Sequence, residues 1–519
     1  MAFFLASLPV LVILALMIGR RWGASRAGGA GYLTALAVAW GYFGAGPRVL
    51  AFAHAKALFL SLDVLLIVWA AFLLYRVADE AGAIEIIGQT LPRLTHDRGM
   101  QALLLGWAFA SFLQGAGGFG VPVAVIAPLL VGLGFSPLAA VVIPSVGHAW
   151  AVSFGSLATS FQALMAATGL PGEVLASPTA FLLGVAGLAV GLMVAHAAEG
   201  WAAVRRLWPT VLLMGGAMAG TQYLLATHHL WNIGALGGGL AGLLAGVLLA
   251  RRQQQRTPAV HQNSAPPVPP ATLWIALSGY LALVLITLVV QLVTPVRHFL
   301  EGLWVVQWPF PALSTARGFQ TPAGFGRKLP VFRHAGLVLF YASAVAYGFY
   351  RQAGWYRPGA ARRIVGSTAR RVMGPSVGIT SMVAMAMVMQ HAGMTETLAQ
   401  GLAHAVGQAY PLFAAWVGAL GAFMTGSNTN SNVIFAALQQ RTANLLGYSA
   451  AVILAAQSAG GALASVFAPP KVVVGASTTG MAGREGDVMA ALGKYVAALV
   501  TLVSLLTVVA LAWGAWLGR

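Results

Sequence analysis

The chain has 519 residues, of which 59% are hydrophobic and 8% are charged. Soluble globular chains carry about 25% charged residues, so this composition excludes a soluble protein and predicts an all-α polytopic membrane protein. The formal net charge is +18, but the basic residues stand in short clusters between apolar runs. That is the positive-inside pattern of cytoplasmic loops and not a nucleic-acid-binding surface. The absence of cysteine excludes disulfides and Cys-based metal sites.

The first apolar run, residues 3–18, is followed by positive charges instead of being preceded by them. This order is the reverse of that in a cleavable signal peptide. With Arg20, Arg21 and Arg26 in the cytoplasm, the first helix is expected to run inward, which leaves the N-terminus outside.

Apolar stretches of spanning length predict about 12 to 14 transmembrane helices in two halves, residues 1–250 and 272–519. A segment rich in Gln and Pro, 251–271, separates the halves and predicts a cytoplasmic linker. Residues 296–334 are of mixed polarity, and we interpret them as an extramembrane or interfacial loop of unassigned role.

One stretch of the first half, F-L-Q-G-A-G-G-F-G-V-P at 112–122, cannot form a stable continuous helix. It contains four glycines and a proline: Gly115, Gly117, Gly118, Gly120 and Pro122. In hydrocarbon, a broken backbone occurs only where protein buries it or where it lines a water-filled cavity. We therefore expect a re-entrant hairpin at about 112–133 that faces a transported solute.

The second half repeats this pattern around the stretch G-S-N-T-N-S-N at 426–432. Gly115 corresponds to Gly426 and Ser145 to Ser458, with two residues gained inside the second break. Paired interrupted segments at matching positions of two halves indicate the binding site of a secondary transporter. The sequence therefore predicts a second hairpin at about 424–446. Chance similarity between helices rich in Gly, Ser and Ala is the alternative.

The second break places several polar side chains, Ser427 to Asn432, in an apolar environment. Polar groups left unpaired in hydrocarbon cost several kcal/mol each, so these must face partners, water or a ligand. Backbone N–H groups at a helix start, with Ser, Thr and Asn donors, suit a small carboxylate. The alternative is that these side chains only cap the half-helices.

Three ionisable residues within apolar segments are functional candidates. Lys471, whose insertion costs about 2.5–3.5 kcal/mol, is expected to compensate an anionic substrate, or else to snorkel near a helix end. His148 can carry a proton near neutral pH or serve as a structural histidine. Asp63, the only carboxylate well inside a spanning segment, is either a proton site or a residue placed near a helix start.

The predicted substrate-binding residues lie in the two breaks and in the segments that follow them. They are Gln114, Gly115, Gly117, Gly118, Ser145, His148, Ser427, Asn428, Thr429, Asn430, Gln457, Ser458 and Lys471. His148 and Asp63 are the candidates for proton coupling. No metal ligands, cofactor or catalytic residues are predicted, because H-E-x-x-H and G-x-S-x-G are absent. The match to G-x-G-x-x-G at 115–120 has transmembrane flanks and no preceding strand. We therefore do not expect an enzyme.

Several motifs together resemble one family. They are S-L-P-V near the start, F-L-Q-G-A-G-G-F-G-V-P-V-A with L-L-V-G-L-G-F-S-P-L at 112–138, W-P-T-V-L-L-M-G-G at 208–216, M-G-P-S-V-G-I at 373–379, G-A-F-M-T-G-S-N-T-N-S-N at 421–432, and G-R-E-G-D at 483–487. On these motifs the chain resembles the L-lactate permease family of bacterial proton-coupled transporters.

The resemblance implies uptake of lactate or glycolate by proton symport across the bacterial inner membrane. The S-N-T signature is also similar to hairpin tips of the wider ion transporter superfamily. That similarity implies two inverted repeats, each with a re-entrant hairpin, an elevator-like movement and a homodimer, in contact with the lipid bilayer.

The chain departs from the family pattern where charge matters. The family usually has Glu where Gln114 stands and Asp where Asn428 stands, and its Asn-Thr-Ala-Pro stretch is replaced by Gly147 to Trp150. We therefore expect a secondary active transporter that takes up a small organic anion, a lactate- or glycolate-like monocarboxylate, by proton symport. The alternatives are a sodium-coupled carrier of another small anion, such as a sulfonate or a different carboxylate, and a non-transporting membrane sensor.

Overall fold

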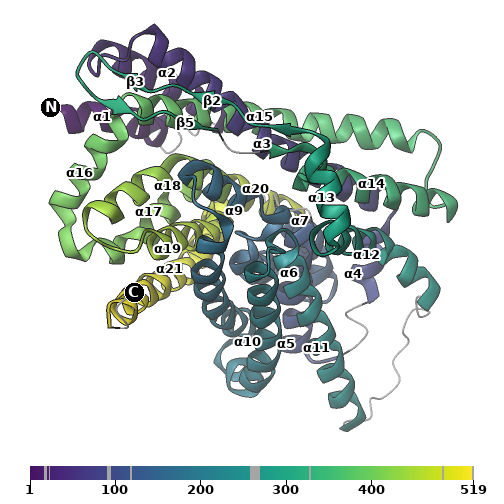
Figure 1. Ribbon diagram of the computed structural model, residues 1–519. Helices are drawn as coiled ribbons and strands as arrows, with labels where there is room; N and C mark the ends of the chain where they lie inside the picture. Colours follow the sequence, from purple (N-terminus) through teal and green to yellow (C-terminus); the bar gives the residue numbers. More distant parts are fainter. Residues whose placement is uncertain are drawn as a thin grey trace.

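A computed structural model describes residues 1–516 except 17–19, 21, 23, 91–94, 117–119, 257–268, 327–328 and 482–483. The predicted all-α membrane fold is confirmed, since helices form almost all of the described chain (Figure 1). The centre of the expected linker at 251–271 lies outside the described residues.

The first half contains no strand among its described residues and is built from helices. They are α1 (Ala2–Leu14), α2 (Ala24–Gly41), α3 (Pro47–Glu80), α4 (Ala83–Thr90), α5 (Arg98–Gln101), the π-helix η3 (Ala102–Phe109), α6 (Ala110–Ala116), α7 (Val121–Gly132), α8 (Pro137–His148), the 3₁₀ helix η4 (Ala149–Ala151), α9 (Gly155–Thr168), α10 (Gly172–Thr227), the 3₁₀ helix η5 (Trp231–Ile233) and α11 (Gly234–Arg256).

The second half begins with two helices and a short strand segment and then continues as helices. The helices are α12 (Pro270–Leu292), α13 (Thr294–Leu303), η6 (Val331–Arg333), α14 (Ala335–Gln352), α15 (Ala360–His391), α16 (Met394–Val406), η7 (Gly407–Ala409), α17 (Tyr410–Thr425), α18 (Asn428–Leu445), α19 (Ala450–Ala464), η8 (Ser465–Phe467), α20 (Pro469–Thr478) and α21 (Glu485–Trp516).

Residues 304–330, which we call the flap, hold all the strands of the described chain. The strands pair antiparallel as β1 (Val305–Val306) with β6 (Leu329–Pro330), β2 (Pro309–Phe310) with β5 (Gly324–Phe325), and β3 (Leu313–Ser314) with β4 (Gln320–Thr321). The flap lies along α2 and α3, where the Ala316 amide donates to the Gly44 carbonyl oxygen at 2.9 Å. The position of this segment relative to the membrane stays a prediction.

The helices form two layers (Figure 1). In one layer, α3 packs against α14 and α15, while α2 packs against α1 and α15. In the other, the hairpin α17–α18 packs on α19, and α10 packs on α11 and α19. Helix α9 joins the layers because it contacts both α3 and α18.

By length and composition, seven helices among the described residues can cross a membrane, or eight if the bent pair Pro137–Ala151 and Gly155–Thr168 counts as one span. The 56-residue helix α10 is broken at Glu199 and Gly200, where Gly200 has φ +69°. Each half of α10 is therefore long enough to cross once. The expected total of about 12 to 14 spans stays a prediction.

Candidate functional site

Each half of the chain contains a helical hairpin whose tip is a backbone break. In the first, α6 ends at Ala116 and α7 starts after Gly120, which has φ +84°. The tip between them, with Gly117 and Gly118, lies outside the described residues. In the second, α17 ends at Thr425, and the next residue, Gly426, has φ +71°, a left-handed conformation that glycine adopts without strain. The Ser427 hydroxyl then caps α18 by accepting a hydrogen bond from the main-chain N–H of Asn430.

The helix that follows each hairpin is also broken. Helix α8 passes through η4 into α9, and α19 passes through η8 into α20. At the start of α9, Ser156, Leu157 and Ala158 have φ of 46°, 54° and 62°. A left-handed turn of non-glycine residues costs roughly 1–2 kcal/mol per residue. Such strain persists only where the surrounding structure imposes it, and it is often found at functional sites.

The glycines paired by the sequence repeat have the same packing role in both halves. A Cβ at Gly147 would lie 1.8 Å from the Gly106 carbonyl oxygen, and one at Gly460 would lie 1.9 Å from the Ala415 carbonyl oxygen. Each glycine therefore lets α8 or α19 touch the backbone of the helix that leads into its own hairpin. The repeat is thus a structural repeat, with the hairpin and the broken helix in the same order.

A small polar cavity lies where the two repeats meet. It has a volume of about 20 Å³. Its lining comes from both repeats and consists of Gln114, Val152, Ser156, Thr159, Ser160, Gly426, Ser427, Asn428, Thr429 and Lys471. Five predicted binding residues therefore meet at one place: Gln114, Ser427, Asn428, Thr429 and Lys471. A volume of this size holds about one water molecule.

Lys471 supplies the positive charge of this cavity. It stands in the first turn of α20, and its ammonium donates a hydrogen bond to the Ser465 hydroxyl at 3.1 Å. No carboxylate is present in the described lining, and no described carboxylate forms an ion pair with Lys471. The cavity therefore has a net positive charge, which suits an anion.

Hydrogen bonds across the cavity wall join the repeats. The Asn428 amide donates to the Ser153 hydroxyl at 3.1 Å, and Ser153 is 3.0 Å from the Ser458 hydroxyl. The Ser160 hydroxyl lies 3.1 Å from that of Thr429. Predicted residues of the second repeat are thus held by hydroxyls at the break of the first.

Four buried amide oxygens in this region have no hydrogen-bond donor among the described residues. They are Gln114 Oε1, Asn428 Oδ1, Asn430 Oδ1 and Asn432 Oδ1. A buried polar atom without a partner costs about 1–3 kcal/mol. The oxygens of Gln114 and Asn428, which line the cavity, can therefore accept a hydrogen bond from a hydroxyl or a water, or coordinate a cation.

Glycines shape the space for the two amides of the lining. A Cβ at Gly155 would lie 2.7 Å from Gln114 Nε2, and a Cβ at Gly461 would lie 2.2 Å from Asn428 Oδ1. Both amides therefore lie directly against backbone, which fixes where their oxygens point.

Other predicted site residues do not line the cavity. Gly115 packs on α11, where a Cβ would meet the Leu236 nitrogen at 2.4 Å. The Ser145 hydroxyl donates to the Val141 carbonyl oxygen of its own helix. Gln457 donates to Ser431 and accepts from Gln439.

Three further candidates also lie outside this lining. Asn430 is buried in the first turn of α18. Ser458 contacts Ser153, and neither residue belongs to the lining. His148 is fully buried, its Nδ1 pairs with the Pro144 carbonyl oxygen, and its Nε2 has no partner among the described residues. It is close enough to Lys471 for an electrostatic interaction. Asp63 belongs to α3, and its side chain lies outside the described residues.

The sequence reasoning missed the hydroxyl residues at the start of α9. Ser156, Thr159 and Ser160 line the cavity, and Ser153 holds Asn428. Their signal is a run of hydroxyl residues in an apolar segment, V-S-F-G-S-L-A-T-S at 152–160. This density of hydroxyl groups resembles that of 427–432, but it lies two helices, α7 and α8, beyond the glycine-rich break.

The chain is similar to known proteins over most of its length. A family model described as L-lactate permease matches residues 2–513. The L-lactate permease of Escherichia coli (strain K12) is 28% identical over 467 residues, covering 85% of this chain and 83% of the relative. That of Bacillus subtilis (strain 168) is 28% identical over 474 residues, with the same shares covered. The glycolate permease GlcA of Escherichia coli (strain K12) is 26% identical over 475 residues, also covering 85% and 83%.

Among solved structures, the chain is similar to the YdaH transporter of Alcanivorax borkumensis, with a TM-score of 0.48 and 18% identity over 91% of this chain and 88% of that one. The family match spans nearly the whole chain and includes both hairpins and the cavity between them. The protein is a member of the L-lactate permease family, a multi-pass membrane transporter of a small organic anion and not an enzyme.

Proposed function

We propose that this protein imports a short 2-hydroxymonocarboxylate, such as lactate or glycolate, across the bacterial inner membrane by proton symport. The observation that carries the proposal is the meeting of Lys471 with amide and hydroxyl groups from both repeats around one cavity without a carboxylate. The names of the relatives, lactate and glycolate permeases, support the same chemical class.

The groups of the cavity match the two ends of such a substrate. The carboxylate would pair with the Lys471 ammonium and accept from backbone N–H groups in the first turn of α18, where the helix dipole favours an anion. The 2-hydroxyl group would donate to the orphaned oxygen of Asn428 or Gln114. The hydroxyls of Ser156 and Thr159 complete a polar wall.

Binding requires the cavity to enlarge. About 20 Å³ accommodates one water and not a monocarboxylate. Gly426, at the tip of the second hairpin, has φ +71°, and glycine can rotate to other backbone conformations without strain. We infer that α18 moves relative to α9 as substrate enters. An elevator-like shift of the hairpin layer against the α2, α3 and α15 layer is the larger movement that we propose.

His148 is the proposed proton carrier. It is buried beside the cavity, its Nε2 is unpaired among the described residues, and it is close to Lys471. Burial and the nearby Lys471 ammonium disfavour a proton on His148 while the cavity is empty. A carboxylate bound at Lys471 would offset that repulsion, so the proton and the substrate would cross together. Asp63, on α3, is the second candidate.

The buried amide oxygens that lack a hydrogen-bond donor among the described residues also favour a second candidate, sodium coupling. Sodium is coordinated by neutral oxygens at broken helices in other carriers. Asn428 and Asn432, one turn apart on the same side of α18, present two such oxygens. In this alternative, the cation takes the place of the proton, and the anion site at Lys471 is unchanged.

Uptake into proteoliposomes tests the proposal. Radiolabelled lactate and glycolate are supplied with an inward proton gradient, and separately at equal pH with sodium or with choline. Accumulation that needs the proton gradient and ignores sodium supports symport with protons, whereas dependence on sodium favours the alternative. 2-Hydroxyethanesulfonate in place of lactate tests the preference for a carboxylate.

Variants connect uptake with the cavity. Lys471→Gln is expected to weaken lactate binding roughly 10- to 150-fold, because a hydrogen bond to a charged group contributes about 1.5–3 kcal/mol. Lys494→Gln, at an exposed lysine of α21, is the matched control and should bind as the unaltered protein does. Unchanged lactate affinity in Lys471→Gln would remove the cavity from the transport route.

A further inference from the structure

A second and larger cavity lies between the flap and the helices, away from the polar cavity. Its volume is about 540 Å³. The flap contributes Gln307, Trp308, Phe310 and Phe325. Helices α3, α9 and α15 and the connection 169–171 contribute the remaining walls, which include Lys56, Met165 and Gln390. Pockets of this size bury a ligand with a substantial apolar body, which is larger than lactate.

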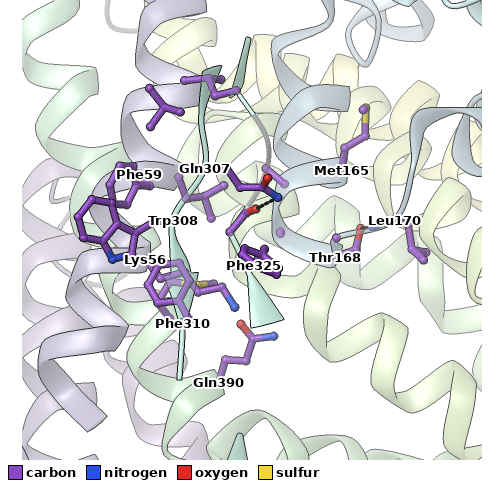
Figure 2. A pocket seen from close by; sticks show the side chains of 18 of the residues that line it. Lys56, Phe59, Met165, Thr168, Leu170, Gln307, Trp308, Phe310, Phe325 and Gln390 are labelled. Atoms are coloured by element: carbon purple, nitrogen blue, oxygen red, sulfur yellow. Dashed lines mark hydrogen bonds between the residues drawn. The ribbon is translucent and has the colours of Figure 1, made fainter. Parts of the chain in front are cut away.

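The cavity combines one cation with aromatic walls. Figure 2 shows Met165, Thr168 and Leu170 across the space from Lys56 and Phe310. The Lys56 ammonium lies 5.9 Å from the centre of the Phe310 ring. No residue of the described lining is acidic, and no described carboxylate pairs with Lys56. A half-buried ammonium without an anion is a binding group for one.

Two amides are placed to assist the lysine. The side chain of Gln390 has no hydrogen-bond partner among the described residues, and Figure 2 shows it close below Lys56 and Phe310. The Gln307 amide donates to the Gly326 carbonyl oxygen at 3.2 Å, which ties one side of the flap to the other. The amide of Gln390 is therefore available to a carboxylate that Lys56 holds.

Contacts of aromatic rings hold the flap over α3. Trp308 stacks on Phe59 with centroids 6.1 Å apart, and Phe310 meets Phe52 edge-on at 6.4 Å. Trp308 and Phe325 nevertheless remain 56% and 74% exposed. Exposed aromatic faces beside a cavity suit a ligand with a flat apolar body.

The positive-inside rule assigns the cavity to the outer end of the molecule. Lys56 and Arg76 are twenty residues apart on α3, roughly 30 Å along the helix, which matches a hydrocarbon core of about 30 Å. At the other end, Glu80 of α3 pairs with Arg363 of α15, in a region rich in arginine. Because such clusters face the cytoplasm, the Lys56 end faces outward.

We propose that the flap cavity is a second anion-binding site, open to the outside, for a carboxylate carried on an aromatic or extended apolar body. The carboxylate pairs with Lys56 and Gln390, and the body lies among Trp308, Phe310 and Met165. The site goes beyond the proposed import of a short hydroxy acid, since its ligand is too large for the polar cavity. Helix α9 lines both cavities, with Ser160 and Met165 only about 7.5 Å apart along its axis, so an occupied flap cavity would hinder movement of α9.

Titration calorimetry of the purified full-length protein with 3-phenylpropionate tests this site. The unaltered protein is expected to bind 3-phenylpropionate and not to bind the neutral 3-phenylpropanamide. Lys56→Gln should weaken binding about tenfold or more, since charge-assisted hydrogen bonds are the strong ones, while Lys56→Arg should restore most of the affinity. Equal binding of the acid and the amide, or unchanged binding in Lys56→Gln, overturns the proposal.

A crossed pair of variants separates this site from the transport site. Lys471→Gln should lose lactate binding and keep phenylpropionate binding. Lys56→Gln should lose phenylpropionate binding and keep lactate binding. If Lys471→Gln loses lactate binding while Lys56→Gln binds phenylpropionate with unchanged affinity, the second site is overturned and the proposed function stands. Should Lys56→Gln fail to fold, Trp308→Ala on the flap replaces it, with the same weakening expected and unchanged affinity again overturning the site.

Discussion

The side-chain amide of Asn432 donates a 2.9 Å hydrogen bond to the main-chain carbonyl oxygen of Ser160, which lies 272 residues earlier in the chain. The same amide donates to the Ser458 hydroxyl at 3.1 Å. Asn432 belongs to the second hairpin, whereas Ser160 follows the left-handed turn of the first repeat. One side chain therefore connects the two breaks on which the binding site depends.

Replacing Asn432 by leucine should destabilise the protein. The change leaves the Ser160 carbonyl and the Ser458 hydroxyl without this donor in a fully buried position, and an unsatisfied buried group costs about 1–3 kcal/mol. Asn444→Leu, at an exposed position of the same helix, is the control, expected within about 0.5 kcal/mol. Thermal unfolding in detergent measures both, and equal melting temperatures would contradict the assigned connection.

Gly461→Ala should disturb the cavity through Asn428. The added Cβ would lie 2.2 Å from Asn428 Oδ1, so the amide must turn away, at a cost of about 1–3 kcal/mol for overpacking. Lactate affinity should fall together with stability. Gly216→Ala in α10 is the control, because its Cβ would meet nothing within 4 Å. The higher helix propensity of alanine should raise its stability by roughly 0.5–1 kcal/mol. Both variants behaving alike would refute the close contact.

The left-handed turn of α9 predicts an unusual ranking of two alanine-to-glycine changes. Ala158 has φ +62°, whereas Ala163 lies in the right-handed part of the same helix, and both are fully buried. Glycine relieves strain at the first position and weakens the helix at the second. Ala158→Gly should therefore be more stable than Ala163→Gly by about 1.5–3 kcal/mol. The opposite order in thermal unfolding would mean that the turn is absent.

Gln114→Glu should make lactate uptake depend on pH. The introduced carboxylate shares the cavity lining with Lys471, so in its ionised form it competes with the substrate for the ammonium. Uptake should be low at neutral pH and recover as acid neutralises the carboxylate. Gln114→Met keeps the position neutral and should leave the pH profile of the unaltered protein in place. A profile in Gln114→Glu that matches the methionine variant would place Gln114 away from the substrate.

Much of this site could be predicted from the sequence. The two glycine-marked breaks identified both hairpins, because only a few residue types tolerate an open backbone within a membrane. Lys471 and the S-N-T run stood out for a related reason, since charge and unpaired polarity in hydrocarbon require a partner. The structure brings Gln114, Ser427, Asn428, Thr429 and Lys471 to one cavity.

The remainder depended on how helices cross. Gly115 and Gln457 match the residue types of a site, yet one packs on α11 and the other joins a chain of side-chain hydrogen bonds. Nothing local in the sequence separates a glycine that approaches a ligand from one that approaches a helix. The left-handed turn at Ser156 to Ala158 was also unpredictable, because these residue types rarely adopt positive φ and only tertiary packing imposes it.

The most direct test of the central claim, that a small organic anion binds at Lys471 between the two repeats, is a crystal structure with 3-bromopropionate bound. The anomalous signal of bromine marks the ligand independently of the protein density. We predict one strong peak in an enlarged cavity bordered by Lys471, Asn428 and Ser156, and its absence in Lys471→Gln. The account would be contradicted if the protein still transports bromopropionate but the bromine peak lies elsewhere and the cavity is closed and unchanged.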